Sequence, residues 1–404
     1  FYLGNSVRNI EELGFIHTEE STRVAEQLTE CLAPTSLPKR MRADGSFEEL
    51  PVRPAHDPDS EGLLTKKEKE TIDGVAPDVR FSKGEHLWNN NERRMQFEQV
   101  AEGSVTLDEF VAQLSDEELA HLLGGQPNTG VANTFGFGNL PECGIPNFMT
   151  ADGPAGLRLE TPCTAIPIAT TLAQSWDMDL IHRMGELVGE EMKQLHVDLW
   201  LAPGMNIHRN PLCGRNFEYY SEDPVLTGLC AATETKGVQS QKGKGTTIKH
   251  FAGNNQEDNR MFTNAHISER ALREIYLKGF EIAVKTAQPY AIMTSYNLIN
   301  GVHSANNYDM LQNIARDEWG FEGLVMTDWY TSQDTTEMGM VSSSGKYSHS
   351  SSVQCIKAGN DLQMPGCQQN MDDIVEAVNE GKEITKADLQ RCAKHILSVA
   401  LKTM

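Results

Sequence analysis

The stretch Gly323-Leu-Val-Met-Thr-Asp-Trp329 decides the fold. Residues 324–327 are apolar or β-branched, and they predict a short buried strand. A carboxylate, Asp328, and a large aromatic side chain, Trp329, follow at once. In a barrel of parallel strands, the side chains that carry chemistry lie at the C-terminal strand ends, where the loops open. Asp328 therefore has two readings, as a group placed for chemistry or as the N-cap of the next helix, a position that Asp favours.

Similar short strands recur along the chain and alternate with helical patterns. The other strand candidates are residues 147–151, 199–203, 246–248 and 291–296. The segment 268–285 predicts an amphipathic helix whose apolar face comprises Leu272, Ile275, Tyr276, Phe280 and Ala283. Alternation of this kind over about 300 residues indicates an α/β fold with a parallel sheet. The pattern alone leaves a closed barrel and an open doubly wound sheet as alternatives.

The N-terminal part differs in composition from the rest. Residues 34–78 are rich in Pro and charged residues and poor in large apolar ones, which is typical of a connection or an extended wrap. Thr106-x-x-Glu109 and Ser115-x-x-Glu118 are capping boxes, and each predicts the start of a short helix. We therefore expect an N-terminal segment or linker over residues 1–104 and a folded domain over 105–404.

Composition excludes several classes of function. The net charge of −22 argues against nucleic acid or an anionic membrane as a partner. No apolar run reaches the roughly 20 residues needed to span a bilayer. The first residues lack the basic start and long apolar core of a signal peptide, and the start on Phe1 rather than Met is also compatible with a fragment of a longer chain. The eight cysteines are spread singly without a Cys-x-x-Cys pair, which predicts reduced thiols and a cytoplasmic location.

Charged and hydrogen-bonding residues follow several of the predicted strands. They are Asp152, Arg158, Arg215, Glu218, Lys249, His250, Asn254, Asn255, Arg260, Tyr296 and Asn297. If the strands are parallel, these side chains share one mouth with Asp328. Acids, cations and an aromatic ring suit a neutral polyhydroxylated ligand, and the cations would keep Asp328 ionised. Lys249-His250 also fits a simple pair in solvent at a strand end.

A metal is not expected at this mouth. His250 has no partner at the spacing of three or four residues that metal ligands on a helix require, and its neighbours are amides.

The motifs around these residues resemble, in their order, those of the barrel domain of glycoside hydrolase family 3. The likeness spans roughly residues 105–404. It rests on Asp152-Gly-Pro-Ala-Gly-Leu-Arg158, Gly214-Arg-Asn-Phe-Glu218, Lys249-His-Phe-Ala-Gly-Asn-Asn-Gln-Glu257, Met293-Thr-Ser-Tyr-Asn297 and Thr327-Asp-Trp329.

The resemblance implies a TIM-type (β/α)8 barrel, preceded by the extra N-terminal segment, that hydrolyses β-linked terminal sugars with retention and without a cofactor. It implies that Asp328 is the nucleophile. It also implies that the residues around the terminal sugar are Asp152, Arg158, Arg215, Lys249, His250, Met293, Tyr296 and Trp329.

The resemblance leaves the acid/base residue unassigned. In this family it usually comes from an α/β sandwich domain, for which 404 residues leave no room beside the barrel. Some members place that domain first, so residues 1–100 fit its tail and linker, with the acid on a missing domain or a second chain. Glu61 and Glu85 are alternatives, but such residues in a polar linker are usually solvated. The sequence is also compatible with a homo-oligomer.

These features predict a retaining exo-β-glycosidase that acts on terminal β-D-glucosyl residues. The Asn-Asn-Gln run after Lys249-His250 disfavours the N-acetylglucosaminidase branch, which the resemblance associates with a His in this loop. One alternative is a β-xylosidase of the same family. Another is a barrel that binds sugar but lacks its acid/base. An unrelated phosphate-dependent enzyme is disfavoured because the chain lacks a Gly-rich phosphate loop.

Overall fold

The computed structural model describes residues 94–128, 134–333, 346–381 and 383–404, together with four short strands nearer the N-terminus. The chain divides into two compact units, Phe1–Lys66 and Lys67–Met404. The described strands of the first unit form two antiparallel pairs. These are β1 (Lys39–Met41) with β2 (Phe47–Glu49), and β3 (Ser60–Glu61) with β4 (Leu64–Thr65).

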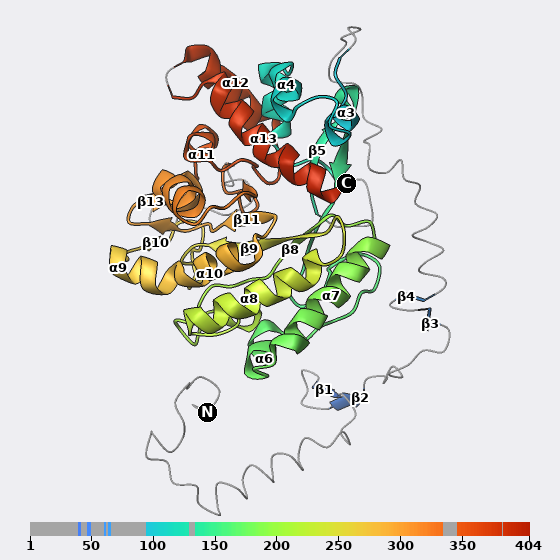
Figure 1. Cartoon of the computed structure of the whole chain (residues 1–404). Helices are drawn as coiled ribbons and strands as arrows, with labels where there is room; N and C mark the ends of the chain where they lie inside the picture. Colours follow the sequence, from blue (N-terminus) through green and yellow to red (C-terminus); the bar gives the residue numbers. More distant parts are fainter. Residues whose placement is uncertain are drawn as a thin grey trace, which may run out of the picture. The chain divides into compact units, whose positions relative to one another are not determined.

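A five-stranded parallel sheet forms the centre of the second unit (Figure 1). Its strands pair in the order β14-β11-β9-β8-β7, so each strand lies beside the next one along the chain. Their bounds are β7 (Thr150–Asp152), β8 (Leu199–Leu201), β9 (Gly245–Phe251), β11 (Ala291–Thr294) and β14 (Leu324–Met326). The predicted α/β fold with a parallel sheet is therefore confirmed.

The sheet continues beyond β14 through single bridges. Leu362 pairs in parallel with Met326, and Gln363 pairs in parallel with Gly124. The amide of Thr327 also donates to the carbonyl of Leu362 at 2.9 Å. These pairings extend the row of strands on one side, while the closed eight-stranded barrel stays a prediction.

Helices α7 (Met178–Gln194), α8 (Pro224–Gln239) and α10 (Lys278–Ala287) lie side by side along the sheet (Figure 1). Glycines permit their close approach. A Cβ atom on Gly185 would lie 2.3 Å from the carbonyl oxygen of Glu234, and one on Gly228 would lie 2.8 Å from that of Gly279. A larger side chain at either position would force these helices apart.

The segment 268–285, predicted as one continuous helix, differs in the structure. It comprises α9 (Glu269–Ala271), a π-helical turn η4 (Leu272–Tyr276) and α10. The amide of Leu277 donates to the carbonyl of Leu272, five residues earlier, at 2.8 Å. The wider turn changes which side chains face inward, because it inserts one residue into the helical repeat. Apolar spacing alone does not reveal such an insertion.

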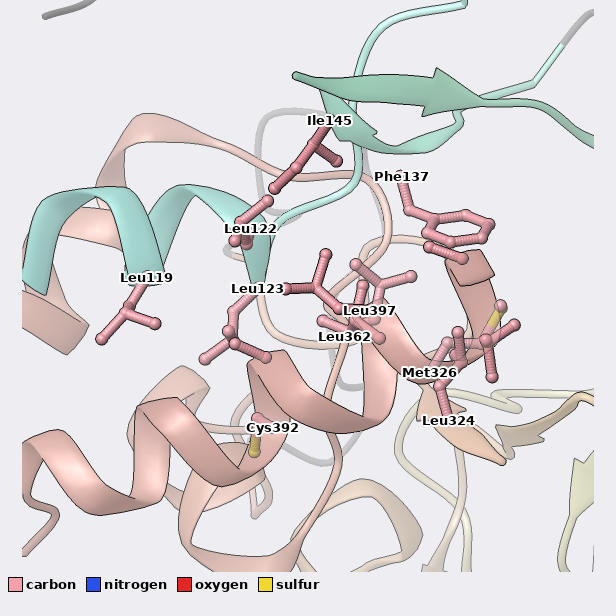
Figure 2. Packing of buried hydrophobic residues seen from close by; sticks show 14 of the residues in the cluster. Leu119, Leu122, Leu123, Phe137, Ile145, Leu324, Met326, Leu362, Cys392 and Leu397 are labelled. Carbon is pink, nitrogen blue, oxygen red and sulfur yellow. The ribbon is translucent and has the colours of Figure 1, made fainter. Parts of the chain in front are cut away.

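A second group of helices packs around another apolar core within the same unit. Figure 2 shows Leu123, Leu362 and Leu397 meeting there, and all three are buried. The helices of this group are α3 (Phe97–Ala101), α4 (Leu107–Ala112), α5 (Asp116–Leu122), α11 (Ser352–Ala358), α12 (Gln368–Glu380) and α13 (Lys386–Thr403).

Both predicted capping boxes are present at the starts of α4 and α5. In each, the hydroxyl of Thr106 or Ser115 accepts from the amide three residues later, and the glutamate there accepts from the cap amide. Packing begins before the expected domain boundary at residue 105, because Phe97 of α3 is buried 5.5 Å from the ring of Phe110.

The remaining elements connect the main strands and helices. They are β5 (Phe137–Leu140), β6 (Ile145–Phe148), β10 (Asn264–Ala265), β12 (Leu298–Ile299), β13 (Val302–His303), α6 (Ala169–Gln174), η2 (Pro141–Cys143), η3 (Asn216–Glu218), η5 (Ser304–Asn306) and η6 (Asp309–Glu318).

Among the described residues, no helix has the length and apolarity that a membrane span requires. Among the described cysteines, Cys143, Cys213, Cys230, Cys355, Cys367 and Cys392 are free thiols. The cytoplasmic location stays a prediction.

Asp361 secures the strand that leads to Asp328. Its fully buried carboxylate accepts from the Val325 amide at 2.8 Å, from Arg316 Nη2 at 2.6 Å and from His395 Nδ1 at 2.8 Å. Burial favours the neutral acid, but His395, Arg316 and the amide outweigh it and hold the pKa of Asp361 below its usual value. Its contribution to stability is therefore present at neutral pH and is lost as the pH falls through this lowered pKa.

We expect Asp361→Asn to lower the free energy of unfolding by about 3–5 kcal/mol at pH 7, because it leaves the buried Arg316 cation without its carboxylate. The urea midpoint followed by tryptophan fluorescence measures this loss. Asp372→Asn, which changes an exposed carboxylate on α12, is the matched control. Equal midpoints for the two variants would contradict the role given to Asp361.

Candidate active site

A cavity of about 460 Å³ opens where the carboxyl ends of the parallel strands meet. Asp152 ends β7, Lys249 and His250 lie near the end of β9, Met293 belongs to β11, and Asp328 follows β14 by two residues. The residues lining the cavity are Thr134, Asp152, Arg158, Leu201, Arg215, Phe217, Glu218, Lys249, His250, Arg260, Met293, Tyr296, Asp328 and Trp329.

The structure brings together Asp328 and the eight residues that the resemblance placed around the sugar. Asn254, Asn255 and Asn297, which the sequence also placed at the mouth, do not line this cavity. The structure adds Glu218 and Arg260, which the sequence analysis placed at the mouth without giving them a role. It also adds Thr134, Leu201 and Phe217, for which the sequence carries no distinguishing signal. Apolar residues such as Leu201 look the same in sequence whether they face a cavity or a core.

Asp152 lies between two cations. Its Oδ1 is 2.6 Å from Lys249 Nζ, and its Oδ2 is 3.1 Å from the Arg158 guanidinium. Partial burial would raise the pKa of Asp152, but Lys249 and Arg158 outweigh burial and lower it. Asp152 is therefore an ionised hydrogen-bond acceptor at neutral pH and is unsuited to donating a proton.

Asp328 is buried at 8% exposure and still faces the cavity. Its Oδ1 accepts from the amide of Trp329 at 2.8 Å, and its carboxylate is hydrogen-bonded to the hydroxyl of Tyr296. Burial raises the pKa of Asp328, whereas Arg215, Lys249 and the Trp329 amide act to lower it. Because these donors and cations restrain the rise, the group can hold a negative charge in a buried position.

The backbone of His250 is clamped from the neighbouring loop. Asn206 Oδ1 accepts from the His250 amide, and Asn206 Nδ2 donates to the His250 carbonyl, both at 2.8 Å. The amide of Met205 donates to the Lys249 carbonyl at 2.6 Å. These bonds fix the end of β9 and with it the directions of Lys249 and His250. The sequence gives no sign of Asn206, which is far from both in the chain.

Glu218 adds a third carboxylate to the cavity wall. Its carboxylate pairs with the guanidinium of Arg215, and burial raises the pKa of Glu218. Arg260 lies over the ring of Tyr296, with its guanidinium carbon 4.9 Å from the ring centroid. Arg260 also pairs with Glu257 at 3.0 Å. The acids on the wall are thus each beside at least one cation.

Donors, acceptors and aromatic faces line the cavity together. Such a wall can bind the hydroxyl groups of a neutral ligand while a flat ring such as Trp329 packs on its C–H groups. In the part of the chain that the structure describes, no group of three or more His, Cys, Asp or Glu residues could hold a metal ion.

With this geometry in place, the comparisons with known proteins define the class. The family model described as "Glycosyl hydrolase family 3 N terminal domain" matches residues 138–399. The match covers most of the chain, including the described strands from β6 to β14 and the whole of the cavity except Thr134. The chain belongs to glycosyl hydrolase family 3.

Two glycosidases are similar to this chain over most of its length. Beta-glucosidase A of Butyrivibrio fibrisolvens is 45% identical over 403 residues, which are 97% of this chain and 46% of that protein. An exo-alpha-(1->6)-L-arabinopyranosidase of Bifidobacterium longum is 44% identical over 306 residues, 72% of this chain and 37% of that protein. The chain therefore spans less than half the length of these relatives.

Solved structures agree with this assignment. A beta-glucosidase from Paenibacillus barengoltzii matches with a TM-score of 0.70 and 40% identity, over 90% of this chain and 39% of that one. Beta-glucosidase 3B from Thermotoga neapolitana, in complex with alpha-D-glucose, matches with a TM-score of 0.66 and 43% identity, over 73% of this chain and 42% of that one.

We expect Lys249→Met to raise the pKa of Asp328, because the substitution removes a cation that lowers it. Carbon-13 NMR of protein labelled at the aspartate carboxyl carbons measures the titration, with the Asp328 signal assigned by its loss in Asp328→Asn. Lys242→Met removes an exposed lysine and serves as the control. An unchanged Asp328 pKa in Lys249→Met, or an equal change in the control, would contradict the electrostatic role of Lys249.

Proposed function

We propose that the protein is a retaining exo-β-glycosidase that hydrolyses terminal, non-reducing β-D-glucosyl residues. The single observation that carries the proposal is the buried Asp328 carboxylate, which faces a cavity of hydroxyl-binding groups. The cations of Arg215 and Lys249 offset its negative charge. The beta-glucosidase relatives support glucose as the sugar.

In the proposed reaction, Asp328 acts as the nucleophile in a double displacement. Its carboxylate oxygen forms a bond to the anomeric carbon while the glycosidic C–O bond breaks, and an acid delivers a proton to the leaving oxygen. Water then attacks the glycosyl ester, gives up a proton to the same acid/base group and releases the sugar with its configuration retained. The reaction needs no cofactor.

The remaining residues bind the sugar. Asp152 accepts from sugar hydroxyls, and Lys249 and Arg158 keep it ionised and donate to neighbouring oxygens. Arg215, His250, Met293 and Tyr296 complete the wall, and Trp329 offers an aromatic face. The hydroxyl of Tyr296 orients the Asp328 carboxylate, to which it is hydrogen-bonded.

The acid/base group lies outside the described cavity in this proposal. Asp152 is held ionised by its cations and is unsuited to the role, and the Glu218 carboxylate is already engaged by Arg215. The relatives are more than twice as long as the matched region, which supports an acid on a sandwich domain or a second chain. The proposal also includes the (β/α)8 barrel, which the continuation of the sheet through Leu362 and Gly124 supports.

Two alternatives remain within the proposal. A β-xylosidase would use the same nucleophile and would lack contacts to the hydroxymethyl group of glucose. A tenfold preference corresponds to only about 1.4 kcal/mol of transition-state binding, so few contacts separate the two activities. The other alternative is a domain that binds sugar without turning it over, because the acid is absent.

Rates on dinitrophenyl and mononitrophenyl β-glucosides test the proposal, with Asp328→Asn as the control. The dinitrophenolate leaves with little protonation, so its release depends on the nucleophile and the sugar site alone. We expect rapid release from the dinitrophenyl glucoside, slow release from the mononitrophenyl glucoside, and at least a 10³-fold loss in Asp328→Asn, about 4 kcal/mol in barrier.

Each other outcome would change the assignment. Equal rates on the two glucosides would place the acid/base within these 404 residues. Faster release from the matching xyloside or α-L-arabinopyranoside would change the sugar. Binding of glucose by calorimetry with no release from any of these substrates would favour the sugar-binding alternative.

A further inference from the structure

The imidazole of His250 lies between the guanidinium of Arg215, which can only donate hydrogen bonds, and the hydroxyl of Tyr219. Arg215 Nη2 is 3.0 Å from His250 Nε2, and the hydroxyl of Tyr219 is 3.2 Å from His250 Nδ1. A guanidinium has donors and no acceptor, so Nε2 must present its lone pair to Arg215. The proton of the neutral ring then resides on Nδ1 and is donated to the Tyr219 oxygen.

The other side of Tyr219 is compatible with this assignment. Asn254 Nδ2 is 2.9 Å from the Tyr219 hydroxyl and 3.1 Å from Glu257 Oε1. An ionised carboxylate only accepts hydrogen bonds, so the Asn254 side chain must turn its NH₂ group toward Glu257. The same nitrogen therefore also donates to the Tyr219 hydroxyl. The Tyr219 oxygen accepts from Asn254 on one lone pair, and the second lone pair is available for His250 Nδ1–H.

The choice of tautomer matters because Asp328 is close to the same ring. His250 Nε2 lies 3.7 Å from Asp328 Oδ2. A proton on Nε2 could approach that oxygen and stabilise its lone pairs, which would make the carboxylate a weaker nucleophile. It would also set an N–H group against the N–H group of Arg215. The tautomer with the proton on Nδ1 avoids both effects.

We propose that Tyr219 is a positioning residue: its hydroxyl accepts the Nδ1 proton of His250 and, together with the donor of Arg215 at Nε2, holds the ring in the tautomer protonated on Nδ1. His250 Nε2 then receives Arg215, and no imidazole proton is presented to Asp328. The tautomer follows from the geometry alone, whereas its value for catalysis rests on the proposed function. Tyr219 is completely buried and does not line the cavity, so it acts through His250.

Nitrogen-15 NMR of the full chain labelled at histidine reads the tautomer directly and needs no activity. The His250 signals are identified by their loss in His250→Gln. We expect a protonated Nδ1 and an unprotonated Nε2 in the wild-type protein at pH 7. A protonated Nε2 in the wild-type protein would overturn the proposal without any need for a variant at Tyr219.

Tyr219→Phe removes the acceptor of the Nδ1 proton and keeps the ring. The buried Nδ1–H then has no partner, so we expect part of the His250 population to carry its proton on Nε2 despite the opposing donor of Arg215. On the dinitrophenyl glucoside we expect kcat to fall roughly tenfold, the effect of losing about one hydrogen bond, with KM changed less than twofold. Tyr220→Phe is the matched control. Its hydroxyl is also buried in the wild-type protein, but it donates to Glu234 and does not contact His250.

The outcomes separate the two proposals. An unchanged His250 tautomer in Tyr219→Phe, or an equal shift in Tyr220→Phe, would overturn the role of Tyr219. A higher KM with an unchanged kcat would contradict the proposed effect of Tyr219 on Asp328. Absence of turnover in the wild-type protein would count against the proposed function, and the NMR result would still decide the tautomer.

Discussion

The structure of the cavity depends on how a buried carboxylate is kept charged. Removing an ionised carboxylate from water costs several kcal/mol unless charges and hydrogen bonds replace the lost hydration. Around Asp328 the replacement comes from the Trp329 amide, the Tyr296 hydroxyl and the cations of Arg215 and Lys249. These groups must be held at fixed positions, because a cation that could turn toward water would no longer offset the burial.

The parallel sheet meets this requirement by bringing distant residues to one edge. Asp152 and Lys249 belong to β7 and β9, and Asp328 follows β14 by two residues. These elements are well separated in the sequence. Behind that edge, Asp361 fixes β14 and Asn206 fixes the end of β9 through backbone hydrogen bonds. The rigidity of the strands therefore limits the motion of the cations, and Tyr219 extends the same control to the imidazole of His250.

Much of this arrangement can be predicted from the sequence where the signal is local. The capping boxes at Thr106 and Ser115, the apolar run before Asp328 and the polar strand ends all follow from short-range preferences. Asp361 could not be predicted in this way, because its partners Arg316 and His395 are brought to it by folding and carry no spacing signal. The π-helical turn before α10 was missed because it inserts a residue without changing the apolar composition.

The most direct test of the central role of Asp328 is covalent capture. A 2-deoxy-2-fluoro-β-glucoside with a dinitrophenyl leaving group forms the glycosyl ester without acid assistance, and the fluorine slows its hydrolysis. Peptide mass spectrometry then locates the sugar. We predict one labelled peptide with the sugar on Asp328 and no labelling of Asp328→Asn. A sugar found on another carboxylate, such as Asp152 or Glu218, would contradict the assignment of the nucleophile.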